Sequence, residues 1–173
     1  GIPVTNAAGL KTEAAADFTL ALLLAISRRV VEADRYMRAH HFKGWKSMLF
    51  LGPELKGKTI GIVGSGRIGA SVARKCQAAF GMKILYTDIV KHKELECKCN
   101  ARKVTLKTLC KTSDFISLHT PLCGSTHHLI GKEELGLMKK TAYLINTSRG
   151  PVVDEKELVK VLRRKQIAGA ALD

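Results

Sequence analysis

Residues 64–69 read Gly-Ser-Gly-Arg-Ile-Gly, a G-x-G-x-x-G loop set between two different kinds of sequence. Residues 59–63, just before the loop, have the apolar character of a buried strand, and the residues after it have helical spacing. In this context Gly64 allows a tight turn, Gly66 lets the backbone approach a pyrophosphate, and Gly69 lets helix and strand pack closely. The pyrophosphate would lie at the helix N-terminus, where free N–H groups and the helix dipole favour an anion. The loop therefore predicts a strand–turn–helix unit that binds a dinucleotide.

An acidic residue follows the next predicted strand. Residues 83–86 form a short apolar run, and Asp88 comes directly after it, about twenty residues beyond the loop. A carboxylate at this place accepts hydrogen bonds from the ribose hydroxyls and repels a 2′-phosphate. Asp88 and the apolar Ile89 therefore favour NAD as the cofactor. The nearby Lys91 and Lys93 keep NADP open as the less favoured alternative.

Short apolar runs alternate with amphipathic helical stretches along the rest of the chain. Strands that are covered on both faces of a sheet read as continuously apolar, as these do. The pattern predicts an α/β fold, a Rossmann-type doubly wound parallel sheet of about six strands, preceded by a long helix. We expect strands at residues 59–63, 83–86, 103–104, 114–118, 142–146 and 167–172, and intervening helices at 68–80, 106–111, 132–138 and 154–165.

A long helical pattern precedes the sheet. Residues 12–37 are rich in Ala and Leu and contain no Gly or Pro, which favours a single long helix, and residues 41–53 read as a loop. We therefore divide the chain into residues 1–53, a helix and loop packing on the next part, and residues 54–173, the dinucleotide-binding domain. The helix carries more apolar residues than one contact face needs. It is a candidate for contact with a second copy of the chain, and packing on its own sheet is the alternative.

The formal net charge of the chain is +14, from 29 Lys and Arg against 15 Asp and Glu. Nucleic-acid binding would require basic residues gathered on one face and interleaved with aromatic residues. The basic residues are instead spread along the chain, and aromatic residues make up only 5% of it, so we expect no nucleic-acid partner. The charge suits an anionic cofactor and an anionic substrate.

Cysteine usage and the apolar runs indicate a cytoplasmic protein. The five cysteines have no disulfide-framework spacing, which favours a reducing compartment. Cys97 and Cys99 lack the spacing of a zinc site, so we expect no metal. The longest apolar run, residues 18–26, is too short to span a bilayer, and we expect no membrane association. The chain does not begin with Met and stops at Asp173 directly after an apolar run, so we expect both ends to be cuts through a longer protein.

Polar residues follow the fourth, fifth and sixth predicted strands, where ligands of a doubly wound sheet bind. They include residues 119–122, residues 146–150 and Asp173. The guanidinium of Arg149 has the fork geometry to hold a carboxylate by two parallel bonds, and an ordinary surface arginine is the alternative. His119 is expected to cap a strand or to line the adenine end of the cofactor pocket, and we do not nominate it as a catalytic base.

Several further motifs occur in an order that points to one family. They are residues 12–17 (TEAAAD), 55–59 (LKGKT), 119–122 (HTPL) with Thr126, 146–154 (NTSRGPVVD) and 168–173 (AGAALD). With the glycine loop between them, the chain resembles the D-isomer-specific 2-hydroxyacid dehydrogenases over essentially all of its 173 residues. This group includes glyoxylate and hydroxypyruvate reductases, phosphoglycerate dehydrogenases and formate dehydrogenases.

The resemblance implies a role for each matching residue. Arg149 would be the catalytic residue of this chain, orienting the carboxylate and carbonyl oxygen of the substrate. Arg67 and Ile68 would present N–H groups to the pyrophosphate, and Thr147 and Asp173 would flank the nicotinamide. The complete set of cofactor-binding residues that we expect is Gly64, Ser65, Gly66, Arg67, Ile68, Gly69, Asp88, Thr120, Pro121, Thr126, Thr147, Ser148 and Asp173.

The family's activity is hydride transfer between NAD(H) and a small 2-hydroxy or 2-keto acid, and we expect the glyoxylate/hydroxypyruvate or 3-phosphoglycerate type. The family's catalytic Glu and His lie beyond the position of Asp173 and most of its substrate domain lies before Gly1, so we expect this chain alone to be inactive. The resemblance also implies a homodimer through the cofactor domain. The alternative function is an NAD-sensing, corepressor-like interaction protein on the same fold, which residues downstream of Asp173 would distinguish.

Overall fold

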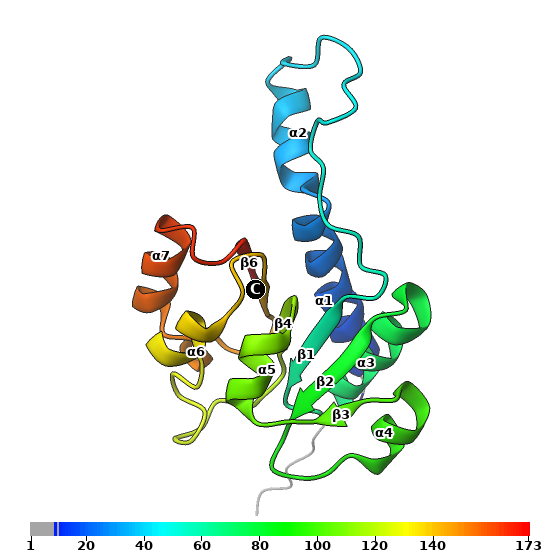
Figure 1. Ribbon diagram of the computed structural model, residues 1–173, viewed down its shortest axis with the longest axis vertical. Helices are drawn as coiled ribbons and strands as arrows, with labels where there is room; N and C mark the ends of the chain where they lie inside the picture. Colours follow the sequence, from blue (N-terminus) through cyan, green and yellow to red (C-terminus); the bar gives the residue numbers. More distant parts are fainter. Residues whose placement is uncertain (1–8, 10) are drawn as a thin grey trace, which may run out of the picture.

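A six-stranded parallel sheet runs through the computed structural model, which describes Gly9 and residues 11–173 (Figure 1). The strand order is β3-β2-β1-β4-β5-β6, so the direction of winding reverses between β1 and β4. This order confirms the doubly wound α/β fold, and ligands of such sheets bind at the reversal, beyond the carboxyl ends of the strands. The strands are β1 (Thr59–Val63), β2 (Lys83–Thr87), β3 (Arg102–Lys103), β4 (Phe115–Leu118), β5 (Tyr143–Asn146) and β6 (Gly169–Leu172).

Each face of the sheet carries its own hydrophobic core. Ile60 and Ile62 of β1 belong to one core, and Val63 belongs to the other, as the alternation of side chains along a strand requires. Both faces are covered by helices, which explains why the strands read as continuously apolar. The first core lies under α1 (Thr12–Ser27), α3 (Arg67–Phe80) and α4 (Lys93–Cys99), and the second under α5 (Leu106–Thr112), α6 (Lys132–Leu137) and α7 (Glu155–Arg163).

The expected N-terminal helix is divided in two. Helix α1 ends at Ser27, and α2 (Val30–Arg38) begins after Arg29, whose φ of 55° lies in the left-handed region. The prediction of a single long helix is therefore wrong. No residue of α2 is buried, and α2 and the loop that follows it project away from the sheet (Figure 1).

The break lies where the returning chain crosses the end of α1. A Cβ at Gly52 would lie 1.8 Å from the backbone oxygen of Ser27, so only glycine allows the returning loop to pass this carbonyl. Ser27 is fully buried there, and the Arg29 guanidinium donates to Glu32 at 2.6 Å in the first turn of α2. We attribute the break to this crossing, which joins residues far apart in the sequence and is not encoded in local helix propensity.

Helix α4 is an element that the sequence pattern did not predict. Its N-terminus is capped by His92, whose Nδ1 accepts a hydrogen bond from the Leu95 N–H at 3.2 Å. The helix exposes Cys97 and buries Cys99. The other strands and helices match the expected ranges to within a few residues, and β3 begins one residue before the expected range. No helix among the described residues is long and apolar enough to cross a membrane.

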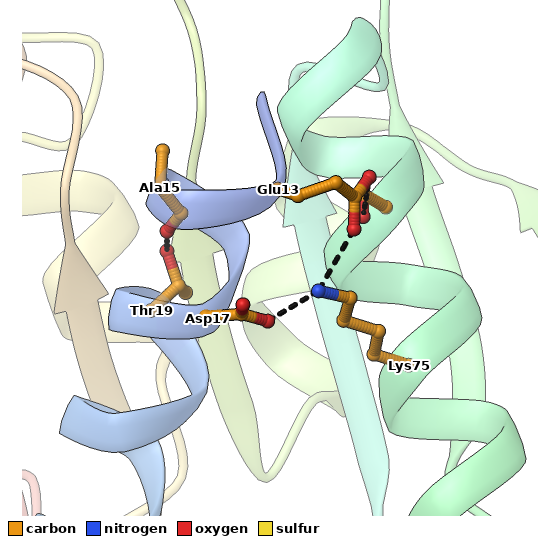
Figure 2. A network of polar contacts seen from close by, with 6 residues as sticks. Glu13, Ala15, Asp17, Thr19 and Lys75 are labelled. Atoms are coloured by element: carbon orange, nitrogen blue, oxygen red, sulfur yellow. Dashed lines mark hydrogen bonds and ion pairs between the residues drawn. The ribbon is translucent and has the colours of Figure 1, made fainter. Parts of the chain in front are cut away.

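Polar contacts fasten α1 to α3 (Figure 2). The Lys75 ammonium on α3 lies 2.8 Å from a Glu13 oxygen and also contacts the Asp17 carboxylate, both on α1. The Ser71 hydroxyl donates to Glu13 at 2.9 Å. On the same stretch of α1, the Thr19 hydroxyl donates to the Ala15 carbonyl at 2.8 Å. The first helix of the chain is thus held beside the helix that follows the glycine loop.

Replacing Lys75 by Met is expected to lower the urea midpoint of unfolding at low salt, because two carboxylates of α1 lose their shared cation. The difference in urea midpoint between the variant and the wild type should shrink in about 1 M NaCl, where the Debye length is only about 3 Å. Lys98→Met is the matched control, since Lys98 pairs only within α4, with Glu94 at 2.8 Å. Equal effects of the two variants in urea titrations would contradict a role for Lys75 in joining the helices.

Candidate functional site

The glycine loop joins β1 to α3 through two close approaches of backbone. Gly64 has a φ of +88°, and a Cβ there would lie 2.9 Å from the backbone carbonyl of His119. A Cβ at Gly69 would lie 2.1 Å from the carbonyl oxygen of Gly64. At Gly66, by contrast, no neighbouring atom of the described residues lies within 4 Å of the Cβ position, so open space faces the start of α3. Gly64 and Gly69 therefore leave no room for a side chain, and Gly66 faces the open space that a bound pyrophosphate requires.

Asp88 lies directly beside this loop. Its Oδ2 accepts hydrogen bonds from the Ser65 N–H at 2.6 Å and from the Ser65 hydroxyl at 2.9 Å, and its Oδ1 accepts from the Val90 N–H at 3.2 Å. Burial acts to raise the pKa of Asp88, but these hydrogen bonds outweigh burial and hold the pKa below its ordinary value. Asp88 is therefore an ionised carboxylate near neutral pH.

A cleft of about 870 Å³ opens on the Asp88 side of the glycine loop. Ser65, Gly66 and Asp88, which the sequence predicts to bind the cofactor, line it. The start of α4 and the turn before it form the opposite wall, which the sequence did not predict. Cationic side chains dominate this lining, with Arg67, Arg74, Lys91 and Lys93 against the carboxylates of Asp88 and Glu94.

A second cleft, of about 830 Å³, opens on the other side of the loop. It shares Gly66 and Arg67 with the first cleft, so the start of α3 lies between the two. The residues that line it come from α3 and from the loops after β4 and β5, with Gly9, Lys11 and Thr12 from the start of the chain. The members predicted from the sequence are Gly66, Arg67, Ile68, Thr120, Pro121, Thr147, Ser148 and Arg149.

The loop after β4 is held by its own side chains. His119 Nε2 lies 2.9 Å from the Ser117 hydroxyl, and burial lowers the pKa of His119 to about 4, so the ring is neutral. His119 directly follows β4 and lines the second cleft together with Arg149. Its expected role as a strand cap or at the adenine end stays a prediction. The Thr120 Oγ1 is buried with no hydrogen-bond partner among the described residues, which leaves a hydroxyl available to a ligand.

The loop after β5 presents Arg149 to the second cleft. The Asn146 side chain organises this loop, accepting from the Ser148 N–H at 3.0 Å and donating to the Arg149 carbonyl at 2.9 Å. Arg149 is exposed, and its Nη1 makes one hydrogen bond, to the Ser148 carbonyl at 2.7 Å. Most of its guanidinium donors therefore have no partner among the described residues and can bind an anion.

Four predicted site residues line neither cleft: Gly64 and Gly69, which form the turn itself, and Thr126 and Asp173. The Thr126 hydroxyl donates to the Pro121 carbonyl at 2.6 Å and accepts from the Cys123 N–H at 2.8 Å, so it shapes the loop that Pro121 belongs to. Asp173 is exposed at the end of β6, where its N–H donates to the Asn146 carbonyl at 2.9 Å. Their expected contacts with the cofactor stay predictions.

The contribution of α1 to the site is not evident from the sequence. Thr12 lines both clefts, and the Thr19 hydroxyl lies 2.9 Å from the hydroxyl of Thr147. Since Thr19 donates its single proton to Ala15, Thr147 is the donor of this bond. The TEAAAD motif marks this helix but does not reveal which side chains reach the sheet. Within the described residues, no group of three or more His, Cys, Asp or Glu side chains could hold a metal ion.

The sheet order, the glycine loop and the ionised Asp88 together define a dinucleotide-binding domain. The family described as "D-isomer specific 2-hydroxyacid dehydrogenase, NAD binding domain" matches residues 20–173. The chain belongs to this family, and its cofactor is NAD. The open cradle at Gly66, the unpartnered Thr120 hydroxyl and the cationic lining all suit this anionic, hydroxyl-rich molecule.

Named relatives agree with this assignment. The chain is 53% identical over 174 residues to a glyoxylate reductase of Korarchaeum cryptofilum, and 52% identical over 177 residues to one of Thermococcus litoralis. All of this chain is covered in both comparisons, against 52% and 53% of the two relatives. The chain thus spans about half the length of the curated relatives it matches.

Solved structures have the same fold. A Thermus thermophilus protein superposes with a TM-score of 0.93 at 46% identity, covering 100% of this chain and 53% of that protein. The D-lactate dehydrogenase of Aquifex aeolicus, complexed with NAD and lactic acid, gives a TM-score of 0.86 at 39% identity, covering 94% of this chain and 47% of that one.

Gly69→Ala is expected to weaken NAD⁺ binding at least tenfold and to lower the free energy of unfolding by about 1–3 kcal/mol, because the new methyl group overlaps the Gly64 carbonyl. Calorimetric titration and urea unfolding measure the two effects. Gly136→Ala is the matched control, since its Cβ position has no atom within 4 Å. Wild-type NAD⁺ affinity in Gly69→Ala would contradict the tight packing of α3 on the turn.

Proposed function

We propose that this domain belongs to an enzyme that transfers a hydride between NAD(H) and a small 2-hydroxy or 2-keto acid. The observation that carries the proposal is that Arg149 lines the same cleft as the start of α3. A guanidinium with free donors binds a carboxylate by two parallel hydrogen bonds. A substrate with a carboxylate would therefore be held beside the cofactor by a residue of this domain.

The residues of the second cleft have distinct roles in this proposal. Bound NAD(H) supplies the hydride acceptor or donor. The N–H groups at the start of α3, including those of Arg67 and Ile68, bind the pyrophosphate, and Thr120 and Thr147 contact the nicotinamide half. Arg149 binds the substrate carboxylate and polarises the carbonyl oxygen, while Asn146 holds the Arg149 backbone in place.

Proton transfer requires a residue outside this cleft. His119 is the only imidazole among the described lining residues, and burial lowers its pKa to about 4. An imidazole with this pKa is neutral at pH 7 and is a poor proton donor there. The family resemblance places the acid/base His and its Glu partner beyond Asp173. We therefore expect this chain to bind NAD⁺ without catalysing turnover by itself.

The substrate class that we propose follows from the named relatives. Glyoxylate reductases match this chain at 52–53% identity, and the D-lactate dehydrogenase of Aquifex aeolicus is known with lactic acid. Glyoxylate and hydroxypyruvate are therefore the first candidates, with 3-phosphoglycerate next. These dehydrogenase and reductase names support an enzyme over the NAD-sensing, corepressor-like alternative. The five free thiols suit a reducing, cytoplasmic location.

The test is a chimera in which this chain replaces the matching half of Thermococcus litoralis glyoxylate reductase. We expect the chimera to reduce glyoxylate with NADH. Arg149→Lys in the chimera should lower kcat/KM for glyoxylate about 100-fold, because an ammonium cannot reproduce the paired bonds of a guanidinium. The affinity for NADH should change by less than about twofold, because the substitution removes a contact with the glyoxylate carboxylate and leaves the contacts with the cofactor.

Arg164→Lys, at the end of α7 and away from both clefts, is the control and should leave kcat/KM unchanged. The isolated chain, not fused to the remaining half of the Thermococcus litoralis enzyme, should bind NAD⁺ and show no turnover of glyoxylate. Full activity of Arg149→Lys would rule out the carboxylate-anchor role, and robust glyoxylate turnover by the isolated chain would contradict the assignment of proton transfer to other residues.

We further propose that residues 30–51 form the contact between two copies of the chain. This projecting segment carries seven exposed apolar side chains, three on α2, which has no buried residue, and four in the loop that follows it. Trp45 is 85% exposed and Met48 is 76% exposed, which are high values for such large apolar groups. The remaining exposed apolar residues of the segment are Val30, Val31, Met37, Phe42 and Leu51. The family resemblance supports a homodimer through this part.

Sedimentation velocity tests the dimer. The chain is expected to sediment as a dimer at tens of micromolar, on the order of the concentrations at which stable dimers persist. The double variant Trp45→Ser/Met48→Ser should sediment as a monomer, because the largest exposed apolar groups are lost. Val159→Ser removes an apolar side chain, 44% exposed, from α7 outside the projecting segment and should stay dimeric. A monomeric wild type would rule out this proposal.

A further inference from the structure

We propose that Ser65 is a positioning residue that fixes the Asp88 carboxylate and thereby sets the preference of this domain for NAD over NADP. The inference rests on the NAD-binding role of the first cleft and extends it to a residue that does not itself distinguish the two cofactors. Ser65 stands in a variable position of the G-x-G-x-x-G loop, where the motif alone requires no particular side chain.

Both donors of Ser65 are used on one oxygen atom. Its backbone N–H and its hydroxyl lie 2.6 Å and 2.9 Å from Oδ2 of Asp88, and the residue is only 2% exposed. The N–H is therefore directed at Asp88, and the pyrophosphate is left to the N–H groups further into α3. Ser65, in the short loop between β1 and α3, thus holds the carboxylate of Asp88, which follows β2.

The second oxygen of Asp88 is held more weakly. Oδ1 has the Val90 N–H at 3.2 Å, within the same exposed turn. Removal of the Ser65 hydroxyl would leave the carboxylate with two backbone donors and more freedom to turn. A carboxylate that turns loses the fixed geometry needed to accept from ribose hydroxyls.

The cationic side chains around Asp88 make the position of its carboxylate important for the choice between NAD and NADP. Arg67, Arg74, Lys91 and Lys93 line the same cleft, and each would attract a 2′-phosphate. Asp88 is the carboxylate among these cations that contacts the glycine loop, and Glu94 is the other acidic residue of the lining. Cofactor choice in this cleft is therefore a balance between one well-placed anion and several cations. Ser65 keeps that anion in place.

The test compares Ser65→Ala with Ser113→Ala by calorimetric titration of the chain with NAD⁺ and with NADP⁺. Ser113 is the matched control because it is fully buried, and its hydroxyl has no hydrogen-bond partner among the described residues. Ser65→Ala should lower the ratio of NAD⁺ to NADP⁺ affinity about tenfold, the order expected for one hydrogen bond to a charged group. Ser113→Ala should leave the ratio unchanged.

A pH profile separates positioning from a general structural effect. The Ser65 hydroxyl contributes to the lowered pKa of Asp88, so its removal should raise that pKa. NAD⁺ binding requires the ionised carboxylate and is lost as the pH falls through this pKa, so the loss should begin at higher pH in Ser65→Ala. The other charged and titratable side chains of this cleft are the same in both variants, so the Ser113→Ala profile is the baseline for their contribution; they are Arg67, Arg74, Lys91, His92, Lys93 and Glu94.

A double-mutant cycle with Asp88→Asn completes the test. If Ser65 acts through Asp88, adding Ser65→Ala to Asp88→Asn should change the affinity ratio no further. An unchanged ratio in Ser65→Ala, or a full additional loss in the double variant, would overturn the inference. Ser65→Gly, which also lacks the hydroxyl, replaces Ser65→Ala if that variant does not fold. A wild-type chain that binds neither cofactor would instead contradict the NAD-binding function itself.

Discussion

The contact between the first turn of α3 and the glycine loop constrains the rest of the site. At Gly69 the position of a Cβ lies 2.1 Å from the Gly64 carbonyl, so helix and turn are closer than any other residue allows. The same turn brings Gly64 against the backbone of His119 at the end of β4. The start of α3 is therefore fixed at the point where the sheet reverses its direction of winding. Both clefts open there because the helix N-terminus stands between them.

Much of the fold and part of the site follow from local sequence, for a physical reason. Strands covered on both faces must be apolar along their whole length, so the strands could be placed to within a few residues. In a doubly wound sheet the carboxyl ends of the strands meet at one edge, so residues directly after a strand are candidates without further information. Asp88 and Arg149 were found in this way, and both line a cleft.

The features that could not be predicted depend on contacts between distant residues. The division of α1 from α2 depends on the passage of Gly52 against Ser27, which no helix propensity encodes. Helix α4 is short, and a histidine caps it, an uncommon choice at that position. The bond between Thr19 and Thr147 exists only because α1 packs beside β5 and β6. The bond from the Thr126 hydroxyl to the Pro121 carbonyl is another contact that the motif does not encode.

Helix α1 connects two parts of the molecule that the sequence presents separately. Its N-terminal residue Thr12 lines both clefts, and its Thr19 bonds to Thr147 in the loop that carries Arg149. Its C-terminus leads directly into the projecting segment at residues 30–51 (Figure 1). An α-helix is stiff over such a length, and ion pairs to Lys75 fasten this one to α3. One rigid element therefore reaches from the exposed apolar surface to the loops of the cleft. Helix α1, which precedes the dinucleotide-binding domain in the sequence, is for this reason part of the site that the domain builds.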